Sequence, residues 1–460
     1  MQEEISDHKL LTFFQKWLNQ HITEYYIPNI RKCGTGIRKG QADSQSVFVI
    51  QNKKNAVTRF DGVLQCHSAW ACPKCTAEVM AKKATEIACA IDALKKQNQT
   101  ATMITFTIPH TKNMTCNEAF QVLLNTWRKF TKGGNRSYNA TIKYTLKTDR
   151  AGKKGNQIIY KRGTNPYGKF REDLKIIHNV RVFEFTYGEN GWHPHIHALF
   201  WAPNKNFNKI VDYEQSLLNH WWYCIKYETE KFWSKKIPKD QLKEFLEKVY
   251  ADYKITSKDG HKSLYISRDR KSPDKPRAVS SSWYIAGWGG DKEVTGNYKQ
   301  KATHSDTNMT PTQIINKAFQ SEGDEREKYL RLYAEYAQTT YKHRRCCYST
   351  SGITKLIREY KQTKEYKERY KKKDTSRDWT IIYWFTRKQW FDILLEERIK
   401  SLYLRDDILE ISKSPLDLKT RRQLIKQFLE SYNIETQINF NSKEAKEIIK
   451  HGEDVLNKVA

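Results

Sequence analysis

The feature that most constrains this chain is the segment HPHIHALF at 193–200, in which histidines alternate with other residues before an apolar stretch. Alternate side chains of a β-strand point to the same face, so His195 and His197 share one face and the residues between them point to the core. Two imidazoles at this spacing can bind one divalent ion. His193 lies on the same side, but Pro194 interrupts the regular strand ladder there.

A third ligand is expected in the preceding strand, RVFEFTYG at 181–188, which carries Glu184. Directly opposed residues of an antiparallel pair share a face. If Glu184 opposes His197, the strands are joined by the four residues Glu189–Trp192. Without a bulge, any register that turns Glu184 toward the histidines needs an even-numbered loop. A His/His/Glu set with open coordination positions suits Mg²⁺ or Mn²⁺ holding a phosphate, and zinc also accepts these ligands.

A second group of metal-ligand residues lies near the N-terminus. Cys72 and Cys75 form a CxxC motif, Cys66 lies six residues before it, and Cys33 precedes a glycine. Four thiolates would make a closed structural zinc site, in which His67 could replace one cysteine. The remaining cysteines are interpreted as core or incidental residues, and the uneven spacing of all nine argues against a disulfide framework.

The charge of the chain indicates a polyanionic partner. Lysine and arginine number 81 against 52 acidic residues, a net charge of +29, and DNA or RNA is the natural candidate. The 13 Trp, 26 Tyr and 19 Phe suit stacking on unpaired bases. The acidic start MQEEISDHKL is unlike a signal peptide and no run of 18 apolar residues occurs, so we expect a cytoplasmic protein without a membrane span.

The length of the chain allows two or three domains. We expect an N-terminal helix with the cysteine zinc module over 1–98 and a central domain over 99–357 with basic insertions at 132–178 and 225–280. A charged helical region is expected over 358–460. The hydrophobic patterns predict helices at 8–20, 76–97, 116–131 and 324–346, and strands at 101–110, 181–188, 192–202, 263–267 and 379–385. The segment 280–293 is expected to begin as a helix that Gly289 and Gly290 end. Residues 30–80 are interpreted as loop-rich, 132–178 as an extended hairpin or mobile arm, and 356–376 as a solvated helix or linker.

The segment GWHPHIHALF, with its preceding glutamate-bearing strand, resembles the HUH motif of rolling-circle Rep proteins, and the chain is similar to the plasmid replication initiator family. Further blocks of the resemblance, scattered over about 30–357, are CHSAWACPKC at 66–75, TFTIPH at 105–110, WYIAGWG at 283–289, Glu293 with Thr295, and residues 331–357. The resemblance implies an α+β fold with a HUH core, which is an antiparallel sheet with flanking helices and a catalytic helix against the metal face.

The resemblance also implies an activity, sequence-specific nicking and joining of single-stranded DNA. A tyrosine, here Tyr284, attacks a phosphodiester with the help of Mg²⁺ or Mn²⁺ and keeps the 5′ phosphate, leaving a 3′ hydroxyl to prime synthesis. Tyrosine titrates near pH ~10, so it must lose its proton during the attack or be activated by positive charge. The implied partners are a single-stranded or cruciform origin, a host helicase and a polymerase in a bacterial cytoplasm.

Two positions depart from the family pattern around the tyrosine. Many relatives carry a lysine three residues after it, where this chain has Gly287, and some carry a glutamate four residues before it, where this chain has Ser280. Tyr298, with Lys301 three residues later, is the alternative nucleophile. Two other functions stay open at this point, a HUH transposase or relaxase and a catalytically inactive, zinc-containing DNA-binding regulator.

Overall fold

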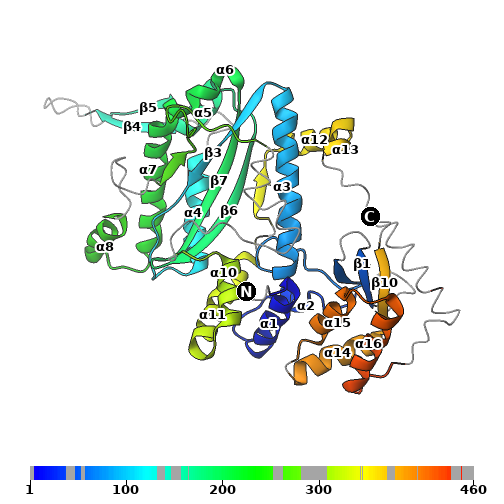
Figure 1. The fold of residues 1–460 in the computed structure, drawn as a ribbon. Helices are drawn as coiled ribbons and strands as arrows, with labels where there is room; N and C mark the ends of the chain where they lie inside the picture. The colour runs from blue at the N-terminus through cyan, green and yellow to red at the C-terminus, as the bar shows by residue number, and fades with distance from the viewer. Residues whose placement is uncertain are drawn as a thin grey trace. The chain divides into compact units, whose positions relative to one another are not determined.

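The computed structural model describes residues 5–37, 47–52, 57–131, 140–146, 157–163, 165–251, 263–280, 308–341, 343, 345–369, 379–400, 402–436 and 447. The fold is α+β, with antiparallel sheets and helices (Figure 1). The chain divides into two compact units. Residues 1–79, 314–341 and 364–460 form what we call the terminal unit, and residues 80–313 and 342–363 form the central unit.

A five-stranded antiparallel sheet is the largest sheet among the described residues, and it lies in the central unit. Its strand order is β8-β3-β7-β6-β9. The strands are β3 (Gln99–Phe106), β6 (Asn179–Gly188), β7 (Gly191–Pro203), β8 (Leu264–Ile266) and β9 (Cys347–Ser349). The strands predicted at 101–110, 181–188, 192–202 and 263–267 are confirmed within a few residues at their ends. The short strand β9 had no sequence signal of its own.

Aromatic side chains hold helices α4 (Cys116–Thr131) and α7 (Glu214–Trp233) on one face of this sheet. The ring of Phe106 on β3 makes edge contacts with Trp127 and Phe130 of α4 and with Trp221 of α7, at centroid distances of 5.2, 5.4 and 5.1 Å. Such contacts add to the stabilisation that burial of apolar area supplies. The helix predicted at 116–131 matches α4 at both ends.

Helices α3 (Pro73–Lys96) and α12 (Ser351–Tyr360) cover part of the opposite face (Figure 1). Their shared core includes Ala84, Ile87, Ile91, Leu94, Val182, Leu199, Trp201 and Ile353. Leu199 and Trp201 follow His197 at steps of two along β7, so they point to the same face of the sheet. The histidines therefore share a face with the core under α3.

The central unit also contains elements outside this core. A hairpin of β4 (Ala140–Leu146) and β5 (Gln157–Gly163) matches the hairpin expected within 132–178. The structure adds α5 (Pro166–Asp173), which the sequence patterns missed although Asn165 caps it by accepting a hydrogen bond from the amide of Gly168 at 2.7 Å. Further elements are α6 (Asn204–Phe207), the 3-10 helix Asn208–Tyr213 and α8 (Lys239–Ala251).

The terminal unit has a three-stranded antiparallel sheet of order β10-β1-β2. Its strands are β1 (Val47–Asn52), β2 (Thr58–Asp61) and β10 (Trp379–Phe385), and β10 is followed by α14 (Arg387–Ile399), α15 (Leu404–Lys413) and α16 (Leu418–Ser431). One core joins them, and it includes Val47, Val49, Phe60, Ile382, Phe385, Trp390, Ile408 and Ile425. The strand predicted at 379–385 is confirmed, whereas β1 and β2 lie in a region that was interpreted as loop-rich.

The other described elements of the terminal unit are helices. It contains α1 (Asp7–Gln20), α2 (Pro28–Lys32), α11 (Gly323–Tyr341) and α13 (Lys364–Arg369), while α10 (Pro311–Gln320) begins just before the unit boundary. The ring of Phe14 on α1 packs edge-on against Tyr333 of α11 at 4.8 Å. The helices predicted at 8–20, 76–97 and 324–346 correspond to α1, α3 and α11. Within the described residues, we find no helix long and apolar enough to cross a membrane.

Candidate metal centres

The β6–β7 hairpin brings Glu184 onto the face of the histidines. Glu184 is directly opposite His195, and the turn consists of two residues, 189 and 190, between the paired Gly188 and Gly191. The expected pairing of Glu184 with His197 across a four-residue loop is therefore wrong by two residues. Gly191 has a φ of +85°, and backbone atoms of 111–112 would lie 3.2 Å from a Cβ there, so glycine permits the tighter turn. A shift of two residues preserves the face.

Three side-chain atoms converge at this site. Oε2 of Glu184 lies 3.2 Å from Nε2 of His195 and 2.9 Å from Nε2 of His197. The three potential ligand atoms all lie within 4.8 Å of one another, and the residues are half-buried. A carboxylate and two imidazoles that share one position are a donor set for a divalent cation, so the residues present fit a metal ion.

The far side of each imidazole is also occupied. Nδ1 of His197 lies 2.9 Å from Oγ1 of Thr105, and Nδ1 of His195 lies 3.3 Å from the carbonyl oxygen of His193. When Nδ1 carries the proton and donates it to these oxygens, the lone pair of Nε2 points toward Glu184 and is available to a cation. Thr105 belongs to the TFTIPH block, but no spacing rule marked it as the partner of His197.

The electrostatics of the site favour positive charge beside Glu184. Burial alone would raise the pKa of Glu184, but hydrogen bonds and charge from His195 and His197 bring it well below its ordinary value. Burial alone would lower the pKa of His195, and the bond to Glu184 reverses this, so that the pKa is raised. Glu184 therefore remains a carboxylate that is compensated by positive charge.

A row of imidazole rings continues from this site to the segment after β3. The ring of His193 lies 5.3 Å from that of His195, and it stacks on His110 with a centroid distance of 4.5 Å and an interplanar angle of 10°. Burial lowers the pKa of His110, which favours its neutral form. The TFTIPH block and the HPHIHALF block, which are separate in sequence, are therefore in contact through their histidines.

Both candidate nucleophiles, Tyr284 and Tyr298, lie outside the described residues, as do Gly287 and most of the helix expected at 280–293. Ser280 is the last described residue of its segment and is exposed.

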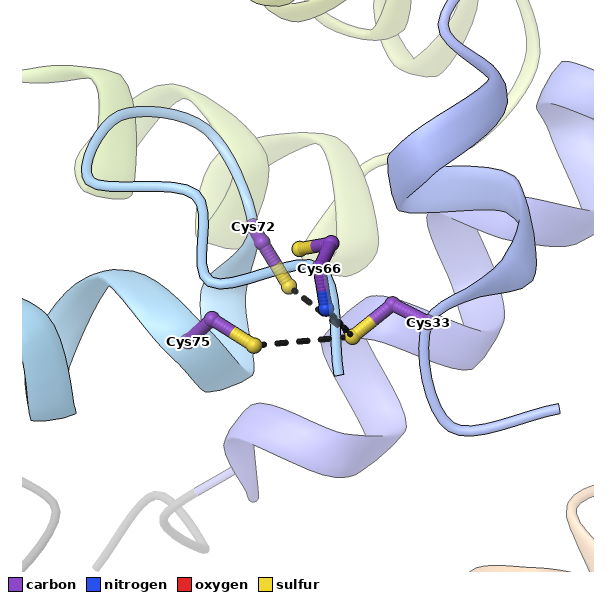
Figure 2. Close-up of side chains that lie close together, drawn as sticks. All are labelled: Cys33, Cys66, Cys72 and Cys75. Atoms are coloured by element: carbon purple, nitrogen blue, oxygen red, sulfur yellow. Dashed lines mark hydrogen bonds between the residues drawn. The ribbon is translucent and has the colours of Figure 1, made fainter. Parts of the chain in front are cut away.

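The expected cysteine cluster is present in the terminal unit (Figure 2). The Sγ atoms of Cys33, Cys66, Cys72 and Cys75 all lie within 4.8 Å of one another. Sγ of Cys33 is 3.5 Å from that of Cys75 and 3.7 Å from that of Cys72, and none of the four forms a disulfide. His67, the alternative ligand, is not part of the cluster. Four thiol groups at these distances, three of them buried, fit a closed structural zinc site.

Local backbone geometry brings three segments to this cluster. Cys33 follows α2, and Gly34 after it has a φ of +71° and donates its amide to the carbonyl of Leu64 at 2.7 Å. This pairing places Cys66 beside Cys33, whose sulfur accepts a hydrogen bond from the amide of Cys66 at 3.4 Å (Figure 2). Cys75 lies in the first turn of α3, where helix amides favour a thiolate.

Side chains distant in sequence hold these segments in place. Tyr333 of α11 donates its hydroxyl to the carbonyl of Ala71 at 2.6 Å, and Gln15 of α1 donates to the carbonyl of Cys33 at 2.7 Å. Arg405 of α15 donates to the carbonyl of Gly34 at 3.1 Å. Hydrogen bonds from the three neighbouring thiols lower the pKa of the Cys33 thiol far below its ordinary value. The cluster is thus built into the core of the terminal unit.

Comparison with known proteins gives two partial similarities. The chain is 31% identical over 141 residues to a protein named "Protein rep" from Streptomyces lividans, a match that covers 30% of this chain and 29% of that protein. It is 32% identical over 139 residues to a protein named "Neomycin resistance protein" from Streptomyces cyanogenus, covering 30% of each. The match thus spans less than a third of either relative. No family model matches the chain. No solved structure is similar to it.

Proposed function

We propose that this chain is a HUH-type DNA-nicking enzyme that initiates rolling-circle replication of a plasmid. The convergence of Glu184, His195 and His197 on one sheet face carries the proposal. The antiparallel sheet with helices on both faces agrees with the expected HUH core. The name of the Streptomyces lividans relative supports a role in replication. The net charge of +29 agrees with a DNA substrate.

The Glu/His/His site would hold Mg²⁺ or Mn²⁺. A divalent ion there supplies charge neutralisation at a non-bridging phosphate oxygen, where negative charge increases in the transition state. Thr105 and the carbonyl of His193 orient the two imidazoles so that both Nε2 atoms and Oε2 of Glu184 face one position. These oriented ligands would fix the scissile phosphate relative to the nucleophile.

The proposed nucleophile is Tyr284. Its phenolic oxygen attacks phosphorus, the bond from phosphorus to the 3′ oxygen breaks, and a phosphotyrosyl bond to the 5′ side forms. The phenolic proton leaves with the attack, and the departing 3′ oxygen takes up a proton to become a hydroxyl. The phosphodiester is exchanged for a phosphotyrosyl ester, so joining of the strand by reversal needs no further energy source.

The cysteine cluster would hold a structural Zn²⁺. Four thiolates leave no open coordination position, so zinc there stabilises the fold and takes no part in nicking. The bonds from Gln15, Tyr333 and Arg405 to the cluster loops agree with this role.

A covalent-adduct experiment tests the proposed function. Labelled single-stranded oligonucleotides, tiled across the DNA that flanks the gene, are incubated with the protein and Mn²⁺ and separated under denaturing conditions. We expect one oligonucleotide to give a protein–DNA adduct that resists denaturation. Tyr284→Phe should abolish the adduct, and Tyr298→Phe, the matched control, should retain it. If no oligonucleotide gives an adduct, the proposed function is contradicted. If the adduct survives in Tyr284→Phe, the assignment of Tyr284 as the nucleophile is contradicted.

A further inference from the structure

Helices α15 and α16 of the terminal unit are joined by only four residues, 414–417. They pack on each other and on the β10-β1-β2 sheet, with Ile408 of α15 and Ile425 and Leu429 of α16 fully buried in one core. A turn of this length between two helices on a rigid support is typical of a helix-turn-helix. We propose that α15 and α16 read duplex DNA, with α16 in the major groove.

The inner side of α16 is fixed to its support by arginines. Arg422 donates to the carbonyls of Ile382 and Ile381 on β10, at 2.9 and 3.1 Å. Arg421 donates to the carbonyl of Ser412 on α15 at 2.8 Å and to the side chain of Gln51 on β1 at 2.7 Å. These bonds set the position of α16 relative to α15 and the sheet, and a recognition element requires such rigidity.

The start of α16 is well defined. Asp417 accepts hydrogen bonds from the amides of Lys419 and Thr420 at 2.9 and 3.1 Å, which is a side-chain N-cap. Pro415 in the turn cannot continue α15. In helix-turn-helix proteins the N-terminal residues of the second helix contact base edges, and here these residues directly follow the cap.

The outer side of α16 has the chemistry of groove recognition. Its exposed side chains include Lys419, Gln423, Lys426 and Gln427, which lie on one face at steps of three and four residues. Glutamine pairs with adenine through two hydrogen bonds, and lysine contacts guanine or phosphate. Among the residues of α16, Glu430 is the only acid, and it pairs with Lys426 at 3.7 Å. Glu430 offsets the charge of Lys426, so this face keeps one positive charge, on Lys419, beside glutamine amides that can hydrogen-bond to duplex DNA.

This inference rests on the proposed function for its DNA partner and adds to it a site for the duplex beside the origin strand. The metal site belongs to the central unit and the helix-turn-helix to the terminal unit, so variants can separate the two activities. A double-stranded RNA partner is disfavoured because the major groove of A-form RNA is too narrow for side chains to read.

The test starts with selection of DNA duplexes with a random central segment by the full-length protein, followed by binding measurements on the enriched duplex. Gln423→Ala and Lys419→Ala should each weaken binding of that duplex by about 10-fold. Lys388→Ala, which changes an exposed lysine of α14 outside the proposed DNA-binding face, is the matched control and should change binding less than about twofold. Thermal unfolding of each variant verifies that it is folded.

The outcomes distinguish this inference from the proposed function. If Gln423→Ala and Lys419→Ala lose the duplex but still form the single-strand adduct, the inference is supported. Unchanged duplex binding in both variants, failure of the protein to enrich any duplex, or equal binding of an RNA duplex with the enriched sequence overturns it. A protein that enriches a duplex through α16 but never forms an adduct supports the recognition helix and contradicts nicking.

Discussion

The hydroxyl of Thr105 lies 2.9 Å from Nδ1 of His197, directly opposite it across strands β3 and β7. This contact orients the imidazole so that Nε2 faces Glu184. Partners of this kind affect metal affinity by about 10–100-fold, so Thr105→Val should weaken Mn²⁺ binding by that factor, and Thr105→Ser should restore it. Paramagnetic resonance of free Mn²⁺ measures the affinity. Thr102→Val, a buried threonine on the other face of β3, is the control, and equal loss in both variants would refute the orienting role.

Glu184 supplies the negative charge of the proposed metal site. Glu184→Gln retains the shape of the side chain but removes the charge that a divalent cation requires, so Mn²⁺ binding and the DNA adduct should both fall by at least about 10-fold. Glu189→Gln, which changes an exposed glutamate in the turn of the same hairpin, should behave like the parent protein. If Glu184→Gln and the parent protein give equal adduct yields at saturating Mn²⁺, Glu184 is not a metal ligand.

The cysteine cluster predicts a specific metal content. The protein as purified should contain one zinc ion per chain by elemental analysis, because four thiolates close the coordination shell. Cys75→Ser should lose this zinc and unfold at a lower temperature. Cys347→Ser, which changes a half-buried cysteine outside the cluster, should retain it. Full zinc content in Cys75→Ser would show that the cluster is not the zinc site.

Arg405 donates to the carbonyl of Gly34 beside the cysteine cluster and forms a buried ion pair with Glu397 of α14 at 2.8 Å, in which both side chains are less than 5% exposed. Arg405→Met leaves a buried carboxylate without its partner and should cost about 3–5 kcal/mol of unfolding free energy. Lys413→Met breaks an exposed pair with Glu410 and should cost less than about 1 kcal/mol. Urea unfolding measures both. The double variant Arg405→Met/Glu397→Met should regain much of the lost unfolding free energy. No recovery would mean that the packing of Arg405 or its bond to Gly34, and not the ion pair, accounts for most of the loss.

Asp406 predicts a pH dependence of stability. Burial acts to raise its pKa, but hydrogen bonds from His8 at 3.2 Å and Ser6 at 3.0 Å, with nearby positive charge, bring it below the ordinary value. The stabilisation is therefore present above about pH 4 and is lost as pH falls through the folded-state pKa. Asp406→Asn should be less stable than the parent at pH 7, and thermal unfolding should show the difference narrowing toward pH 3. A constant difference across this range would contradict the assignment.

The sequence predicted that Glu184, His195 and His197 lie together on one sheet face, because this grouping depends on local periodicity. Alternation on β7 places His195 and His197 on one face, and strand parity adds Glu184 whatever even-numbered loop joins the strands. The register itself was wrong by two residues. Parity cannot distinguish a two-residue from a four-residue turn, and the positive φ of Gly191 that allows the shorter turn is a tertiary property.

The terminal sheet could not be predicted in the same way. β1 and β2 are six and four residues long, and they lie among glycines and cysteines that indicate loops. Strand β10, the partner of β1, was predicted as a strand, but nothing in its own pattern identifies β1 as its neighbour. The place of Cys33 in the cysteine cluster was predicted from its CxxC neighbours and its glycine, whereas the support from Arg405 depends on long-range packing.

The pairing of β1 with β10 has a consequence for synthesis of the protein. The N-terminal cysteines and β1 emerge from the ribosome long before β10. His8 likewise emerges long before its partner Asp406, which lies 398 positions later in the chain. The central unit, most of which is one continuous stretch, is synthesised before β10, so it can fold before the terminal unit is complete. Until β10 is synthesised, the nascent N-terminus exposes an unpaired strand edge and reactive thiols, and it would depend on chaperones and an early supply of zinc.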